Sequence, residues 1–142
     1  ILVEIGGELM AIGRNPKSGT SWKVAIDDPF QNNQRRWITT VELSDQGLAT
    51  SGNYRKYRTD SLTGEKYVHS INPLTGRTVK TNVLSASVLA PDCMTADAWA
   101  TALMVLPLEK GQALIENDPK LEALWIVAKS DSLIQIPSSH WN

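Results

Sequence analysis

Two oxygen-bearing side chains, Asp97 and Thr101, lie four residues apart in a stretch that we expect to be helical. Residues at i and i+4 share one face of a helix, so this carboxylate and this hydroxyl would lie one above the other. Both are hard oxygen ligands of the kind that Mg²⁺ and Ca²⁺ bind. A carboxylate in the first turn of a helix also complements the helix dipole without any metal. The spacing therefore allows a metal site and leaves a purely structural role open.

A histidine, His69, comes shortly before the turn-rich sequence N-P-L-T-G-R, residues 72–77. An imidazole titrates near neutral pH and can serve as a general base. Asn-Pro and Thr-Gly are turn markers, so we expect a loop of defined shape. An isolated histidine is also often a hydrogen-bonded structural residue, and both roles stay open. The other histidine, His140, belongs to the terminal S-S-H-W-N, where fraying is expected.

Two further short motifs have the chemistry to contact a phosphate or a nucleotide. Gly6-Gly7 follows an apolar strand, and paired glycines permit a sharp turn or the close approach of a ligand to the backbone. The sequence A-T-S-G, residues 49–52, ends another strand with hydroxyl and N–H groups that can hold a phosphate. Each motif is equally compatible with an ordinary turn.

The adjacent carboxylates Asp27 and Asp28 stand beside Pro29, which favours a turn over acid–base chemistry.

The helix that carries Asp97 is expected to begin after Pro91, with Asp92 or Thr95 as its N-cap. Its apolar stripe is predicted at Trp99, Ala102, Leu103 and Leu106, which are spaced i, i+3, i+4 and i+7. After Pro107, a second helix is expected over Leu108–Asn117.

Nine segments have strand-like patterns, and turn residues separate most of them. They cover residues 1–5, 8–13, 22–26, 38–43, 48–52, 66–71, 83–90, 124–128 and 133–136. The run N-Y-R-K-Y-R, Asn53–Arg58, interleaves aromatic and cationic residues as some nucleic-acid binders do, but in a nearly neutral chain it is interpreted as a further, exposed strand. A hairpin turn is expected around Thr63-Gly64. The pattern predicts an α+β fold: a single domain over 1–142 with a mostly antiparallel sheet of hairpins and two helices near its C-terminal end.

Composition limits the classes of function. A chain of 142 residues with 42% hydrophobic residues can bury one core. The net charge of −1 disfavours nucleic acid and acidic membranes as partners. The single cysteine, Cys93, excludes an internal disulfide framework and fits a structural role better than a nucleophile. Because the chain opens with Ile1 inside a strand-like run, we expect it to be part of a longer protein.

Four motifs occur in a characteristic order: G-G-E at 6–8, A-T-S-G at 49–52, H-S-I-N-P-L-T-G at 69–76 and A-D-A-W-A-T-A-L at 96–103. This series resembles the C-terminal half of the ApbE family, the FAD:protein FMN transferases formerly described as thiamine-biosynthesis lipoproteins. The resemblance extends from about Leu2 to about Leu106, and the two later motifs are the more specific ones.

The resemblance implies an enzyme that takes FAD as substrate and needs Mg²⁺. It attaches FMN by a phosphoester to a Thr or Ser hydroxyl of a target flavoprotein and releases AMP. It also implies targets such as subunits of membrane redox pumps, and a periplasmic lipoprotein attached to the inner membrane. The implied metal ligands are Asp97 and Thr101, and the implied base is His69. The implied flavin-nucleotide contacts are Gly6, Gly7, Glu8, Thr50, Ser51, Gly52, His69, Ile71, Pro73, Thr75 and Gly76.

The chain departs from the family pattern at three positions. Glu4, Asn72 and Pro107 stand where a small polar residue, Asp and Gly are common. The family's N-terminal half, which supplies a flavin-stacking aromatic residue and further metal contacts, is the expected partner of this chain. Two alternatives follow: an FAD-binding or FAD pyrophosphatase protein in which water replaces the protein hydroxyl, or an inactive fragment that contributes only half of the fold.

Overall fold

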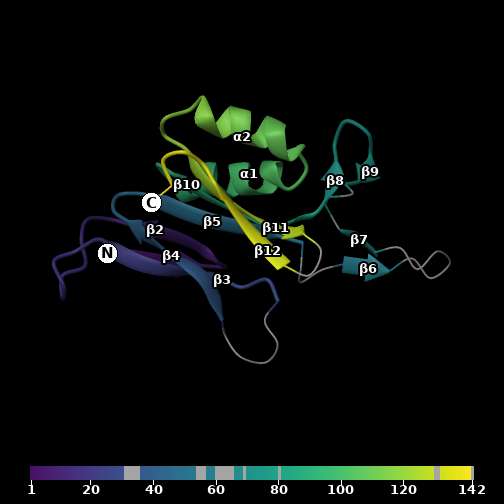
Figure 1. Ribbon diagram of the computed structural model, residues 1–142. Helices are drawn as coiled ribbons and strands as arrows, with labels where there is room; N and C mark the ends of the chain where they lie inside the picture. The colour runs from purple at the N-terminus through teal and green to yellow at the C-terminus, as the bar shows by residue number, and fades with distance from the viewer. Residues whose placement is uncertain are drawn as a thin grey trace.

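The computed structural model describes residues 1–30, 36–53, 57–59, 66–68, 70–79, 81–129 and 132–141 (Figure 1). Six strands form one antiparallel sheet in the order β1-β2-β5-β10-β11-β12. They are β1 (Leu2–Ile5), β2 (Glu8–Ala11), β5 (Gly47–Gly52), β10 (Val83–Ala90), β11 (Glu122–Lys129) and β12 (Ser132–Pro137). Three ribbons pair β3 (Trp22–Asp27) with β4 (Trp37–Leu43), β6 (Tyr57–Thr59) with β7 (Lys66–Val68), and β8 (Ile71–Asn72) with β9 (Arg77–Thr78). The helices are α1 (Cys93–Leu103) and α2 (Leu108–Glu116), so the predicted α+β fold is confirmed.

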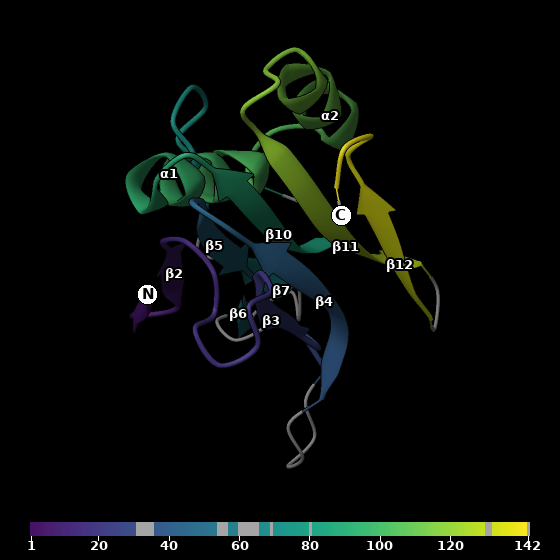
Figure 2. The same cartoon turned by 90° about the vertical axis from the view of Figure 1, so that its left-hand side faces the viewer.

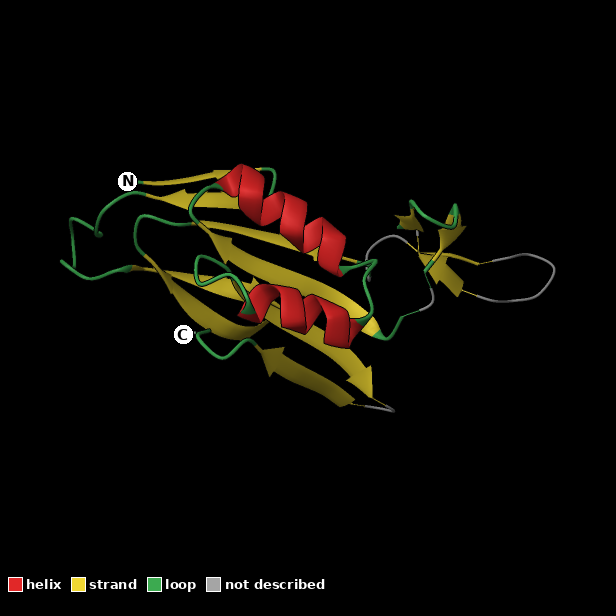
Figure 3. Cartoon of the chain, turned by 90° about the horizontal axis from the view of Figure 1, so that it is seen from above, coloured by secondary structure: helices red, strands yellow, loops and turns green. Residues whose placement is uncertain are grey.

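The sheet lies between two layers. Both helices cover one face, and the β3–β4 ribbon covers the other (Figures 2 and 3). On the helical side, Trp125 and Val88 join a core cluster with α1. On the other side, Leu124 and Leu89 join a second cluster with Val41 of β4. Because β10 and β11 are covered on both faces, most of their residues are buried. Their sequences are mostly apolar, and the polar residues Ser85 and Ser87 of β10 are buried as well.

The first hairpin explains the glycine pair. Ile5 pairs with Glu8, so Gly6 and Gly7 form a two-residue connection between β1 and β2. Their φ angles are +68° and +104°, in the region that favours glycine. The prediction of a sharp turn at Gly6-Gly7 is therefore confirmed.

Helix α1 begins at Cys93 and has Asp92 as its N-cap. The Thr95 backbone N–H donates to Asp92 Oδ1 at 2.8 Å, so Asp92 and not Thr95 caps the helix. The buried positions are Ala96, Ala100 and Leu103. The predicted stripe is therefore confirmed in part: Leu103 is buried, and Trp99 and Leu106 pack half-buried against the same core. The fully buried centre of the helix also includes Ala96 and Ala100, which the stripe did not contain, because small alanines let the helix approach the sheet.

Gly47 permits the start of α1 to approach β5. A Cβ atom on Gly47 would lie 2.6 Å from both the carbonyl carbon of Asp92 and the backbone nitrogen of Cys93. We expect Gly47→Ala to lower the free energy of unfolding by about 1–3 kcal/mol, because backbone atoms must shift to admit the methyl group. Urea denaturation measures this loss. The control is Gly13→Ala, where the added Cβ meets nothing within 4 Å and only the φ angle of +61° is unfavourable. Equal losses in the two variants would contradict the steric explanation.

Other boundaries differ from the prediction in the middle of the chain. The expected strand 66–71 is divided, because β7 ends at Val68 and Ile71 belongs to β8. Asn53, expected in an exposed strand, is only 5% exposed and lies just beyond β5. The turn predicted around Thr63-Gly64 lies outside the described residues. Among the described residues, no helix is long and apolar enough to cross a membrane.

Candidate functional site

The carboxylate of Asp97 and the hydroxyl of Thr101 lie one turn apart on α1, and both residues are exposed. Since α1 begins at Cys93, Asp97 is its fifth residue, and the first turn contains no acidic residue. The structural alternative, in which Asp97 complements the helix dipole from the first turn, is therefore wrong. The spacing of four residues places these two oxygen-bearing side chains side by side on one solvent-facing surface.

Thr101 connects this surface to the A-T-S-G strand. Its Oγ1 lies 3.2 Å from Ser51 Oγ in a hydrogen bond that either atom can donate. The neighbouring Thr50 hydroxyl bonds instead to Ser87 Oγ on β10, at 2.8 Å. Because successive strand side chains point to opposite faces, Ser51 lies under α1 and Thr50 lies on the other side of the sheet. The two hydroxyls of this motif thus serve two different surfaces.

A pocket of about 400 Å³ lies beside α1 and is lined by both Glu8 and Asp97. The structure therefore brings together two predicted site residues that are 89 positions apart in the chain. Cys93 also lines it, and its Sγ donates to the carbonyl oxygen of Leu9 at 3.1 Å. Burial raises the pKa of the Cys93 thiol, and the charges of Glu8 and Asp92 raise it further. These effects disfavour the thiolate, which agrees with a structural cysteine.

A second pocket, of about 260 Å³, brings Gly6, Gly7 and Thr50 together on the other face of the sheet. Carboxylates of Glu4 and Asp27 also line it. The predicted contacts near Gly6-Gly7 and those near Asp97 therefore belong to separate cavities. Next to this pocket, the Phe30 backbone N–H donates to Asp28 Oδ1 at 2.8 Å, so the predicted turn at Asp28-Pro29 is confirmed.

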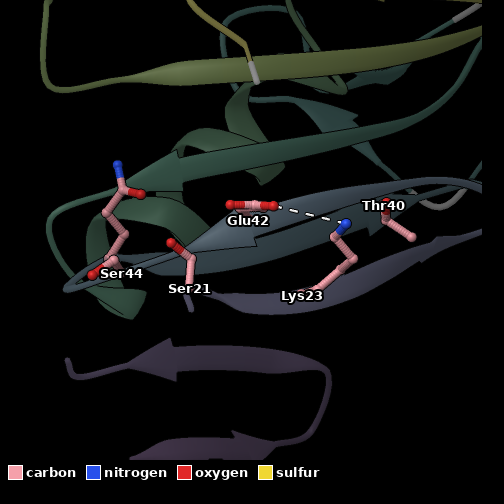
Figure 4. A pocket seen from close by; sticks show the side chains of 6 residues that line it. Ser21, Lys23, Thr40, Glu42 and Ser44 are labelled. Carbon is pink, nitrogen blue, oxygen red and sulfur yellow. Dashed lines mark ion pairs between the residues drawn. The ribbon is translucent and has the colours of Figure 1, made fainter. Parts of the chain in front are cut away.

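A third hollow, of about 520 Å³, lies on the β3–β4 ribbon and contains none of the predicted site residues (Figure 4). Its lining is polar: Ser21, Lys23, Thr40, Glu42, Ser44 and Gln46. Lys23 Nζ lies 3.7 Å from Glu42 Oε1, and both side chains are more than half exposed. An exposed ion pair of this kind contributes little energy, so we assign no function to this surface.

The loop N-P-L-T-G connects β8 to β9 and has the defined shape that its turn residues predicted. The carbonyl oxygen of Asn72 accepts from the backbone N–H groups of Thr75 at 3.2 Å and Gly76 at 2.8 Å. Asn72 Oδ1 also accepts from the Leu74 N–H at 2.9 Å. The loop presents Pro73, Thr75 and Gly76 to solvent, and Ile71 of β8 is 57% exposed. These predicted flavin contacts are therefore accessible to a ligand.

Sequence reasoning missed Asn53. It is one of the few buried polar residues, and Ser70 Oγ donates to its Oδ1 at 3.1 Å. The available signal was strand alternation: Asn53 follows Ser51 by two residues, so it belongs on the same side of the chain. Ser70 is the chain neighbour of His69, and His69 itself lies outside the described residues. The role predicted for that imidazole therefore stays a prediction.

Among the described residues, no group of three or more His, Cys, Asp or Glu side chains is gathered around one point. Asp97 and Thr101 alone fit a cation such as Mg²⁺, which is commonly held by one or two carboxylates and completes its shell with water and phosphate oxygens. A zinc-like site would need more nitrogen or sulfur ligands. One carboxylate and one hydroxyl therefore match the oxygen ligands that Mg²⁺ prefers and not the ligand set of zinc.

Comparison with known proteins gives concordant results. A family model described as the ApbE family matches residues 1–125. The FAD:protein FMN transferase from Vibrio cholerae is 41% identical over 97% of this chain and 40% of its own length. The FAD:protein FMN transferase from Escherichia coli K12 is 37% identical over 92% of this chain and 36% of its own length. Among solved structures, the flavin transferase ApbE from Vibrio cholerae aligns with a TM-score of 0.75 and 38% identity, over 97% of this chain and 42% of the other. The apo form of the Pseudomonas stutzeri flavinyl transferase ApbE aligns with a TM-score of 0.77 and 35% identity, over 97% and 41%. The chain thus spans about 40% of the length of these relatives.

Proposed function

Because this chain belongs to the ApbE family, we propose that it supplies part of the active site for transfer of FMN from FAD to a hydroxyl of a target flavoprotein. The observation that carries the proposal is the pair of exposed oxygens on α1, Asp97 and Thr101, joined through Ser51 to the A-T-S-G strand. Relatives that match nearly the whole chain are named FAD:protein FMN transferases, which supports the same chemistry.

The reaction exchanges one phosphorus–oxygen bond for another. The hydroxyl oxygen of a Thr or Ser on the target attacks the FMN phosphorus, and the bond from that phosphorus to the oxygen bridging to AMP breaks. AMP leaves with the electron pair of that bond, and the hydroxyl proton moves to a base. We assign that role to His69, whose neutral imidazole can accept a proton.

Asp97 and Thr101 are the residues that would hold Mg²⁺ in this chain. When bound, Mg²⁺ supplies positive charge that offsets the negative charge building on the phosphate oxygens. Ser51 keeps the Thr101 hydroxyl in place through its hydrogen bond. The loop N-P-L-T-G presents exposed backbone and hydroxyl groups, so it is suited to bind the nucleotide. Gly6-Gly7 also allows close approach to the chain, but it lines the separate pocket on the other face of the sheet.

Family resemblance extends the proposal to location and partners. We place the activity on the periplasmic side of the inner membrane, in a membrane-attached lipoprotein. The proposed target is a flavoprotein such as a subunit of a membrane redox pump. This chain matches only 40% of the length of the Vibrio cholerae relative. The proposed partner is a segment that corresponds to the rest of that length, and it would complete the site.

The test is covalent labelling of a target. We expect the full-length protein, incubated with FAD, MgCl₂ and a flavin-free target subunit, to yield a fluorescent target band after denaturing electrophoresis. One AMP should be released for each FMN transferred, and EDTA should abolish both products. AMP release without a labelled target would indicate FAD hydrolysis instead, and failure to bind FAD would indicate a catalytically silent chain.

A further inference from the structure

Asn53 joins two segments at the end of β5. Its backbone N–H donates to the carbonyl oxygen of Leu84 at 2.9 Å, which holds it to β10. Its side-chain Oδ1 accepts from Ser70 Oγ at 3.1 Å. Only 5% of Asn53 is exposed, and its bond to the half-buried Ser70 is partly shielded from water.

Ser70 closes the base of the β8–β9 hairpin. Its carbonyl oxygen accepts from the Val79 backbone N–H at 3.3 Å, directly below the pair formed by Ile71 and Thr78. The hairpin consists of two strands of only two residues each, and nearly all its described residues are exposed. A two-stranded hairpin of this kind is marginally stable alone. Its direction therefore depends on anchors at its base, and Asn53 is one of them.

The same strand end also contacts Thr101, one of the two proposed metal ligands. Ser51, two residues before Asn53, bonds to Thr101 near the C-terminal end of α1. Figures 1 and 3 both show the β8–β9 hairpin beyond that end of α1. The short stretch 51–53, at and just beyond the end of β5, thus connects the Thr101 hydroxyl of α1 with the base of the loop N-P-L-T-G.

Asn53 contributes less to the stability of the fold than a small apolar residue at the same position would. No described residue accepts a hydrogen bond from its buried Nδ2. A buried amide with an unpaired donor adds little net stability, and a small apolar residue would avoid that cost. A carboxamide in this place is therefore better explained by the direction that it imposes on Ser70.

We propose that Asn53 is a positioning residue of the nucleotide site, which fixes the N-P-L-T-G loop relative to Asp97 and Thr101 through its bond to Ser70. The proposal rests on the function proposed above, since it assigns the loop to FAD binding. It predicts that breaking this one bond weakens FAD binding while the core and the positions of Asp97 and Thr101 stay unchanged.

The test compares Ser70→Ala, which removes the hydroxyl, with Ser70→Thr, which keeps it, and with Asn53→Ala. In the full-length protein we expect Ser70→Ala to raise the KM for FAD about 3- to 10-fold, the range that one hydrogen bond gives, with kcat changed less than about twofold. Ser70→Thr should restore the KM. The double variant Ser70→Ala/Asn53→Ala should be no worse than Asn53→Ala alone, because both remove the same bond.

Hydrogen exchange without FAD separates this proposal from the proposed function. The amides of Gly76 and Val79 should exchange faster in Ser70→Ala, while those of β10 and β11 should not change. Unchanged exchange, an unchanged KM, or additive losses in the double variant would each overturn the positioning role. Failure of the proposed function would appear differently, as absence of FAD binding and transfer in the unmutated protein.

Discussion

Asp97→Ala is expected to reduce magnesium-dependent FMN transfer by about 10²- to 10³-fold, because a bound metal ion supplies several kcal/mol of charge stabilisation in the transition state. The fold should be unaffected. Asp97 is exposed, and alanine is a better helix former than aspartate. Transfer is measured by the rate at which fluorescent flavin appears on the target after denaturing electrophoresis, over a series of Mg²⁺ concentrations.

The matched control is Glu109→Ala, which removes an exposed carboxylate from α2 that is not among the predicted site residues. It should transfer FMN at the unmutated rate. Thr101→Val should resemble Asp97→Ala, and the double variant should lose little more, since the two residues are proposed to hold one ion. Normal transfer by Asp97→Ala, or equal losses in Glu109→Ala, would rule out a metal role for Asp97.

Local sequence signals predicted most of the elements. Gly6-Gly7 determined a two-residue hairpin because only glycine readily adopts both positive φ angles. The turn markers in 72–77 predicted the loop that Asn72 closes with its carbonyl oxygen. The i, i+4 spacing placed Asp97 and Thr101 on one surface of α1. Each of these features is determined within a few residues of chain.

Features that depend on distant contacts were not predictable in the same way. The stripe predicted on α1 included Leu103 and Trp99, which contact the core, but it omitted Ala96 and Ala100, which are buried because close packing on the sheet favours small side chains. The burial of Asn53 depends on Leu84 and Ser70, which are 31 and 17 residues away in sequence. The meeting of Glu8 with Asp97 depends on the order of strands in the sheet. Composition and periodicity contain no information on such pairings.

The packing also decides which predicted contacts can cooperate. Ser51 lies on the same side as Thr101, whereas Thr50 lies on the side of Gly6 and Gly7. The two hydroxyls of the A-T-S-G motif therefore face different contacts: Ser51 bonds to Thr101, and Thr50 bonds to Ser87 across β5 and β10. The predicted nucleotide contacts of this motif stay a prediction.

His69→Ala is expected to lower kcat for FMN transfer by about 10²- to 10⁴-fold, the range that general-base catalysis supplies. A Thr or Ser hydroxyl is a weak nucleophile, so its proton must be accepted as the new phosphorus–oxygen bond forms. FAD binding should be spared, because the base acts on the acceptor hydroxyl. Calorimetric titration with FAD measures binding, and single-turnover labelling of the target measures the chemical step.

The chain offers a matched control, since it contains only two histidines. His140→Ala changes the other imidazole, which is exposed near the C-terminal end, and should leave transfer unchanged.

Comparison of His69→Ala with Ser70→Ala then separates two effects. Loss of the base lowers kcat at constant FAD affinity, whereas loss of the anchor below the loop raises the KM at nearly constant kcat. Normal labelling by His69→Ala would refute the base assignment. A weakened affinity for FAD with unchanged kcat would assign His69 to binding, because the proton would then have another acceptor.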